Sequence, residues 1–237
     1  YTTDPRIESR ARRLEKVSYE EMLEMASLGA KVLQTRSVEL AMAKQVPVRV
    51  LSSFIEPDEN GALPASAGTL ICDEEEIVEK RIVSGVTMSR DEARITLLGL
   101  ADRTDAPADV FTRLAEANVN VDMIVQSQAR TEGTVNLTFT TGRRDAQRAA
   151  ELMRAEQAQI GFEELRVDED VAKVSVVGVG MRSHAGVAQT MFRALADKGI
   201  KFQAISTSEI KISVLIDAAY AELAVRALHS AYGLEAV

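Results

Sequence analysis

The amino-acid sequence predicts an α+β protein with two tandem βαββαβ units, preceded by the C-terminal end of an α/β domain. Three observations lead to this expectation: the C-terminal part contains an internal repeat, the N-terminal part has a different pattern of helices, and an acidic segment separates the two. The expected divisions are 1–55 for the end of the α/β domain, 56–80 for a linker, 81–160 for the first repeat and 161–237 for the second. Strands can be exchanged between two such repeats.

Residues 1–55 predict two helices and one strand. Ser18 and Glu21 form a capping box in front of an apolar-periodic stretch, and Gly29 suits the end of that helix. A second helix is expected from about Lys31 to Lys44, followed by a strand over Val46–Leu51. Because helix, helix and strand cannot enclose a core alone, we expect this piece to belong to a larger unit outside the chain.

The segment 56–80 reads as an acidic linker. It carries eight acids and no Lys or Arg between its first and last acid: Glu56, Asp58, Glu59, Asp73, Glu74, Glu75, Glu76 and Glu79. Two prolines and two glycines lie among them, as is typical of a solvated spacer. The net charge is −8 from 28 basic and 36 acidic residues, so the rest of the chain is balanced and offers no basic face for nucleic acid.

The internal repeat begins with a strand, a loop and a helix in each copy. The first copy has a strand over Ile95–Gly99 and a helix over Pro107–Ala117, and the second has a strand over Val174–Gly178 and a helix over Gly186–Lys198. A strand follows each helix, over Val119–Val125 and over Ile200–Ser206. A further strand then follows in each copy, over Thr134–Thr140 and over Glu209–Ile216.

Each copy is expected to continue into a helix opened by an aspartate cap, Asp145 or Asp217. A strand near Phe162–Val167 is available to close one copy. The expected result is two four-stranded antiparallel sheets, each with two helices on one face.

The composition excludes several classes of protein. With 46% hydrophobic and 27% charged residues the chain is globular, and no run of apolar residues is long enough to span a membrane. Cys72 is the only cysteine, so we expect neither a disulfide framework nor a thiolate metal site. No signal peptide opens the chain, and we expect a cytoplasmic protein. Because the chain opens with Tyr1 rather than Met, we expect it to be part of a longer or processed chain.

The repeat, with a glycine ending its first strand and a polar loop before the helix, resembles the ferredoxin-like ACT domain, a module that senses small molecules. Several stretches more specifically resemble aspartokinases: 1–6 (YTTDPR), 18–24 (SYEEMLE), 28–33 (LGAKVL), 120–126 (NVDMIVQ) and 206–216 (STSEIKISVLI). The resemblance implies that residues 1–55 end an amino-acid-kinase domain and that tandem ACT domains follow.

By this resemblance, part of an ATP site lies at Tyr1, Asp4, Arg6, Lys31 and Val32. The glycine-rich phosphate loop, the catalytic lysine and the aspartate-binding residues of the family have no counterpart here, so no catalytic residue is expected. ATP is implied as a substrate, with Mg²⁺ bound outside this chain, and no tightly bound cofactor is implied. The implied partners are the remainder of the catalytic domain and a second copy that joins through the ACT repeats, with no nucleic acid and no membrane.

The implied effector is an amino acid, lysine or threonine. Its carboxylate would lie on free N–H groups at the start of the helix in each repeat, and its ammonium needs a carboxylate, which the first repeat offers at Asp102 and Asp122. Met181 and Gln203 stand at the matching positions of the second repeat, and Asp102 as a helix cap is an equal alternative. The candidate effector residues implied by position are Asp102, Asn120, Asp122, Gln126, Val187, Ala188, Lys201, Phe202, Ser208 and Glu209. The family's Pro-Gly is replaced by Thr104–Pro107 in the first loop.

Two other functions remain open at this stage. One is a regulatory subunit without catalytic function that senses an amino acid and acts through partners, although residues 1–55 argue against it. The other is RNA binding by a related βαββαβ fold, for which Phe139 and Phe202 are not arranged as the necessary aromatic platform. His184, His229 and, without the family resemblance, Lys31 read as structural or solvated side chains.

Overall fold

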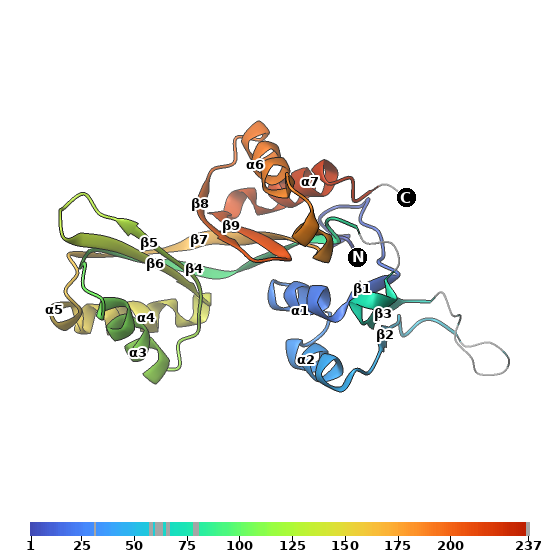
Figure 1. The fold of residues 1–237 in the computed structure, drawn as a ribbon, viewed down its shortest axis with the longest axis horizontal. Helices are drawn as coiled ribbons and strands as arrows, with labels where there is room; N and C mark the ends of the chain where they lie inside the picture. The colour runs from blue at the N-terminus through green and yellow to red at the C-terminus, as the bar shows by residue number, and fades with distance from the viewer. Residues whose placement is uncertain (31, 57–58, 60–63, 65–66, 78–80, 236–237) are drawn as a thin grey trace.

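The computed structural model describes all of the chain except residues 31, 57–58, 60–63, 65–66, 78–80 and 236–237 (Figure 1). The N-terminal part contains β1 (Lys16–Ser18), α1 (Tyr19–Ser27), α2 (Thr35–Lys44), β2 (Val48–Val50), β3 (Thr69–Cys72) and the 3₁₀ helix η1 (Glu74–Glu76). The first repeat contains β4 (Gly85–Ala101), α3 (Ala106–Glu116), β5 (Val121–Gln128), β6 (Thr134–Thr141), α4 (Arg143–Ala155) and α5 (Gln157–Ile160). The second contains β7 (Glu164–Val177), η2 (Val179–Ser183), α6 (Val187–Asp197), β8 (Phe202–Thr207), β9 (Lys211–Asp217), η3 (Ala218–Tyr220) and α7 (Ala221–Ala231).

The repeats share one antiparallel sheet of six strands, in the order β5-β6-β4-β7-β9-β8. Residues 94–98 of β4 pair with 164–168 of β7 in the first half, and residues 85–89 pair with 173–177 in the second half. The α+β fold class is confirmed, but the two separate sheets that we expected are joined. Neither long strand has a glycine or proline at the junction, so both continue from one half into the other.

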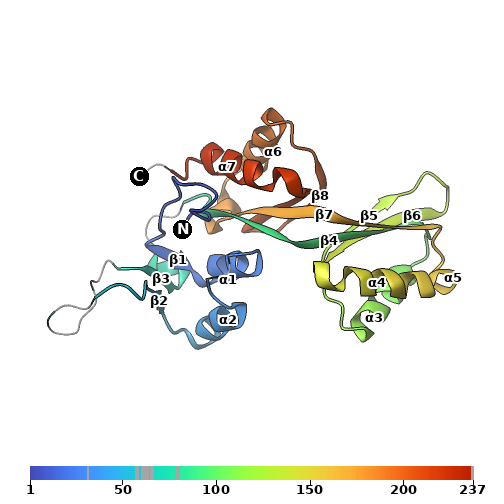
Figure 2. The ribbon, with the colours of Figure 1, turned by 180° about the vertical axis from the view of Figure 1, so that it is seen from behind.

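The helices cover opposite faces of the two halves (Figures 1 and 2). Helices α3 and α4 pack on the first half over a core that includes Ile95, Leu97 and Phe139. Helices α6 and α7 pack on the second half over Val174 and Val176, on the other face. Successive side chains of a strand point to opposite faces, and Val177 accordingly packs against α1 instead. Helix α1 thus covers part of the face of the second half that α6 and α7 leave free.

The N-terminal part forms a small sheet in the order β1-β3-β2. Its middle strand, β3, comes from the segment that we expected to be a spacer, and Ile71 and Cys72 are buried in it. The spacer interpretation of 56–80 is therefore wrong for residues 69–76. The apolar run Thr69–Cys72 lies between two acidic clusters, and burying it between β1 and β2 outweighs the linker-like composition around it.

Most expected elements are present, but the strands expected near Phe162–Val167 and over Val174–Gly178 form one strand, β7. Other differences lie at the ends of elements. The capping box of Ser18 and Glu21 is confirmed, and Asp217 caps η3 before α7 begins. Asp145 does not cap α4; it lies in the first turn and pairs with Arg148, while Gly142 is the N-cap residue. In the part of the chain that the structure describes, no helix is both long and apolar enough to cross a membrane.

Candidate functional site

Four of the five candidate nucleotide residues line one cavity of about 810 Å³: Tyr1, Asp4, Arg6 and Val32. The fifth, Lys31, lies outside the described residues. Gly29 and Ala30 of the turn after α1 line the same cavity, as do Val86–Arg90 of β4. The N-terminal loop, the turn after α1 and strand β4 of the large sheet therefore line one cavity.

Two charged side chains of the N-terminal loop, Asp4 and Arg6, pair with each other. The Arg6 guanidinium donates to both carboxylate oxygens of Asp4, at 3.0 Å and 2.7 Å. These hydrogen bonds lower the pKa of Asp4 below its ordinary value. Because the Arg6 side chain is exposed, the pair contributes little stability, and Arg6 remains available to an anionic ligand.

Thr2 fixes this loop to the C-terminal half of the molecule. Its carbonyl oxygen accepts the Val86 N–H at 2.8 Å, and its hydroxyl lies 2.9 Å from Nε2 of His229, a fully buried residue of α7. Burial lowers the pKa of His229, so the ring is neutral at pH 7. We expected His229 to be structural or solvated; it is structural, and what it holds is the candidate nucleotide loop.

The first-repeat candidates for effector binding do not converge on one point. Asp102 follows β4 at the sheet end where β5 finishes, and its N–H donates to the Gly133 carbonyl at 2.9 Å. Gln126 lies nearer that end, whereas Asn120 and Asp122 lie at the start of β5. Eight residues of strand span about 23 Å. One small ligand cannot touch all four residues in a single copy of the chain.

Asp122, whose own side chain is 52% exposed, pairs with a lysine that is buried beside a buried glutamate. Lys173 of β7 is only 5% exposed along its side chain; its Nζ lies 2.7 Å from Oε1 of Glu92 and also binds the Asp122 carboxylate. Burial alone would lower the pKa of Lys173, but the two carboxylates outweigh it and raise the pKa. An effector ammonium at Asp122 would therefore compete with Lys173.

The second-repeat candidates form two groups at opposite ends of β8. Val187 and Ala188 begin α6, near the β8–β9 turn that carries Ser208 and Glu209; Arg182 in η2 lies 3.4 Å from the Glu209 carboxylate. Lys201 and Phe202 lie at the start of β8, where the Phe202 ring packs on the ring of Phe192 with centroids 5.2 Å apart.

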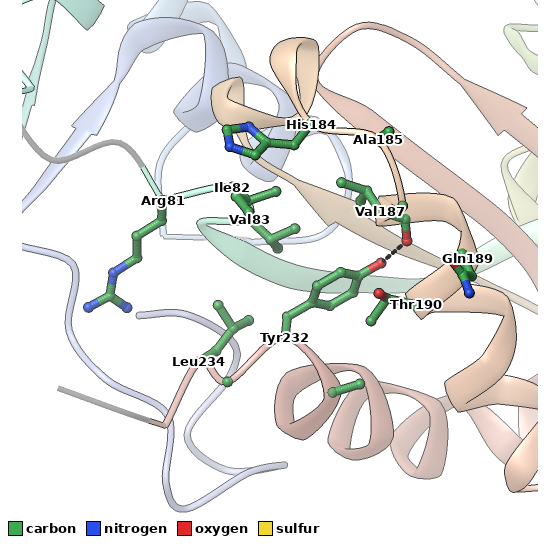
Figure 3. A pocket seen from close by; sticks show the side chains of 13 residues that line it. Arg81, Ile82, Val83, His184, Ala185, Val187, Gln189, Thr190, Tyr232 and Leu234 are labelled. Atoms are coloured by element: carbon green, nitrogen blue, oxygen red, sulfur yellow. Dashed lines mark hydrogen bonds between the residues drawn. The ribbon is translucent and has the colours of Figure 1, made fainter.

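A second cavity of about 670 Å³ opens at the start of α6 (Figure 3). His184 of the loop before α6 and Val187 at the start of α6 form one side, and Tyr232, after α7, forms the other. The Tyr232 hydroxyl donates to the Val187 carbonyl at 2.7 Å, and burial raises the pKa of that hydroxyl. Val187 is the one candidate effector residue that lines this cavity. Among the described residues, no cluster of three or more His, Cys, Asp or Glu side chains could hold a metal ion.

Comparisons with known proteins agree with this architecture. Residues 1–52 match the amino acid kinase family, and residues 174–232 match the ACT domain. An aspartokinase of Pseudomonas aeruginosa is 52% identical over the whole of this chain, which spans 55% of that protein. The chain thus spans about half the length of the curated relatives it matches.

Solved structures give the same assignment. The regulatory subunit of aspartate kinase from Thermus thermophilus is 42% identical, with a TM-score of 0.60; the match covers 64% of this chain and 99% of that one. Aspartokinase III of E. coli, in complex with lysine and aspartate, is 27% identical, with a TM-score of 0.73, over 98% of this chain and 49% of that one. The chain belongs to the aspartokinase family and joins the end of an amino-acid-kinase domain to its ACT regulatory region.

Proposed function

We propose that this chain is the C-terminal part of an aspartate kinase, in which lysine, threonine or both bind the ACT region and inhibit ATP-dependent phosphorylation of L-aspartate. The main support is the cavity of about 810 Å³, which is lined both by candidate nucleotide residues and by β4. A strand of the sensing region therefore borders the candidate nucleotide site. The enzyme would act in the cytoplasm, in synthesis of aspartate-derived amino acids.

In this proposal, Tyr1, Asp4, Arg6, Lys31 and Val32 contact ATP. Phosphate ligands and Mg²⁺ come from the remainder of the catalytic domain, outside this chain. Residues 1–55 belong to the kinase domain and β3 (69–72) adds a strand to its sheet, the rest of 56–80 connects it to the sensor, and 81–160 and 161–237 are the two ACT repeats. Residues 85–92 are then a strand exchanged from the first repeat to the second, since their partner 171–177 lies in the second.

The effector site is proposed to form between two copies of the chain. Asp102, Asn120, Asp122 and Gln126 of one repeat would face the second-repeat residues Val187, Ala188, Lys201, Phe202, Ser208 and Glu209. Strands β5 and β8 are the outer strands of the sheet, and they expose Ile124 and Phe202. Pairing these edges in a homodimer would cover them and bring distant candidate residues together. Lysine in the E. coli aspartokinase III structure supports an amino acid as the effector.

The alternative is a regulatory subunit without a catalytic role. The T. thermophilus regulatory subunit matches only 64% of this chain, and residues 1–52 match a kinase family instead. This observation favours the kinase interpretation.

The purified 237-residue chain is expected to form no aspartyl phosphate from aspartate and ATP. Phosphoryl transfer needs positioned phosphate ligands and metal carboxylates, which a partial nucleotide site does not supply. Formation of aspartyl hydroxamate in the presence of hydroxylamine measures the activity, and adding the missing catalytic portion is expected to restore it. Turnover by this chain alone would contradict the proposed division of the active site.

Asp102→Asn is expected to weaken binding of the effector about ten- to a hundredfold. Asparagine keeps the size of the side chain and removes its charge, so a ligand ammonium loses a charge-assisted hydrogen bond. The N-cap residue of α3 is Asp105, and its side chain makes no capping hydrogen bond. The change at Asp102 therefore does not remove a helix cap. Calorimetric titration of lysine and of threonine measures the loss.

The matched control for Asp102→Asn is Met181→Leu, at the corresponding position of the second repeat. Met181 packs on the core under α6 and α7, and leucine keeps that apolar contact. Its affinity for the effector is expected to stay within about twofold. Equal losses in both variants, or none in Asp102→Asn, would count against Asp102 as the ammonium partner.

A further inference from the structure

Glu21 is a buried carboxylate that three separate segments of the chain bind. Its side chain belongs to the first turn of α1 and the residue is 2% exposed. One oxygen, Oε2, accepts the Ser18 N–H at 3.2 Å and completes the capping box. The other, Oε1, accepts the Ser84 hydroxyl at 2.6 Å and the Val179 N–H at 3.0 Å. Helix capping therefore occupies only one of the two carboxylate oxygens of Glu21.

The Val179 end of this bridge lies in the second ACT repeat. Val179 begins η2, the segment between β7 and α6 that leads to Val187 and Ala188. The backbone there is packed closely against the residues before β4: a Cβ at Gly178 would lie 2.4 Å from the Ile82 carbonyl oxygen. Because the backbone at Gly178 lies directly against this segment, we expect a displacement of η2 to move Val179 relative to Glu21.

The far end of α1 lies at the candidate nucleotide cavity. The helix is nine residues long, and the Ala30 N–H after it donates to the Met25 carbonyl at 2.9 Å. Gly29 and Ala30 then line the cavity of about 810 Å³. A helix this short is marginal alone, so its position depends on its anchors. Glu21 anchors its start, and the turn at Gly29 and Ala30 ends it.

We infer that Glu21 is the positioning residue through which the loop between β7 and α6 of the second ACT repeat acts on the nucleotide turn, with α1 as the rigid connection. Binding of an amino acid at that loop shifts η2, the Val179 N–H pulls on Glu21, and α1 carries the shift to Gly29 and Ala30. This inference rests on the proposed function for the identity of the ligand, but the mechanical connection does not depend on it.

A double-mutant cycle tests the connection without any ligand. Val179→Pro removes the one N–H that the loop offers to Glu21; proline is tolerated at the first residue of a helix, and Gly178 before it has the extended backbone that proline requires. Glu21→Gln leaves one acceptor oxygen where there were two, so the side chain can serve Ser18 or the loop but not both. The readout is hydrogen exchange of the Ala30 amide at the other end of α1.

Val179→Pro is expected to raise the exchange rate of the Ala30 amide about tenfold in the otherwise unchanged chain, and less than twofold when Glu21→Gln is also present. Glu24→Gln is the matched control, because Glu24 lies on the same helix and pairs with Lys211 at 2.9 Å rather than with the loop. In the Glu24→Gln background the tenfold effect is expected to persist. The inference is overturned if Val179→Pro leaves the Ala30 exchange rate unchanged. It is also overturned if the fold-change in the double variant equals the product of the fold-changes in the two single variants.

If Val179→Pro does not fold, Ser84→Ala replaces it in the same cycle, because it removes the other donor to Oε1 and leaves the capping box intact. Lysine and threonine, each at millimolar concentration, then probe regulation. Either ligand that binds by calorimetry is expected to change Ala30 exchange in the unchanged chain and not in Glu21→Gln. An equal change in both overturns the inference. Failure of both ligands to bind would contradict the proposed effectors, while the mutant cycle would still decide the role of Glu21.

Discussion

Lys173→Ala is expected to lower the free energy of unfolding by about 3–5 kcal/mol, the usual loss when one partner of a buried ion pair is removed. Lys173 lies between Glu92 of β4 and Asp122 of β5, and the Glu92 side chain is only 8% exposed. Without the ammonium, no other cation among the described residues pairs with Glu92, and burial already raises the pKa of its carboxyl. Urea unfolding followed by circular dichroism measures the loss.

The matched control for Lys173→Ala is Lys211→Ala. Lys211 also pairs with a glutamate, Glu24, but both side chains are more than 20% exposed, so solvent screens the pair. A loss of about 1 kcal/mol or less is expected there. Adding Glu92→Gln to Lys173→Ala is expected to recover part of the stability, because the buried negative charge is removed. Equal losses for the two lysine variants would show that burial does not set the strength of the Lys173 cluster.

Local patterns in the sequence predicted most of the helices and strands of the fold. The repeat predicted the strand at Ile95 and the matching strand of the second copy at Val174, but not the extension of β4 back to Gly85. Residues 89–92 are Ser, Arg, Asp and Glu, a polar run without the β-branched and aromatic residues typical of a strand. In the structure they cross the junction between the two halves of the sheet, where the pairing of β4 with β7 shifts register. A bulge accommodates polar residues that a regular, buried strand would exclude.

The residues that connect the parts of the molecule were less predictable than the elements. The capping box identified Glu21, because its partner Ser18 is three residues away. The second role of Glu21 depends on Val179, 158 residues away, and no local pattern encodes such a contact. The same holds for Thr2 and His229, which are 227 residues apart. Which polar side chains are fully buried can be determined only once the positions of the strands in the fold are known.

The two matching glycines of the repeat illustrate this limit, because they are required for different reasons. Both were expected to end the first strand of a repeat. Gly99 has a φ of +64°, and the three atoms nearest to a Cβ there belong to the flexible side chain of Glu163. Gly178 has an extended φ of 176°, which any residue adopts, but it lies directly against backbone. The sequence shows a glycine at each position and does not distinguish conformation from crowding.

Gly178→Ala is therefore expected to cost about 3 kcal/mol, at the upper end of the range for overpacking a tight site. The added Cβ would lie 2.4 Å from the Ile82 carbonyl oxygen and 2.7 Å from the Val83 Cα, and backbone cannot rotate away as a side chain can. Gly99→Ala is the matched control, with an expected cost of about 1 kcal/mol from the left-handed backbone alone. Thermal unfolding of both variants measures the difference. A smaller loss for Gly178→Ala than for Gly99→Ala would mean that the segment before β4 can move away from the loop, and close packing at Gly178 would then not hold η2 in place.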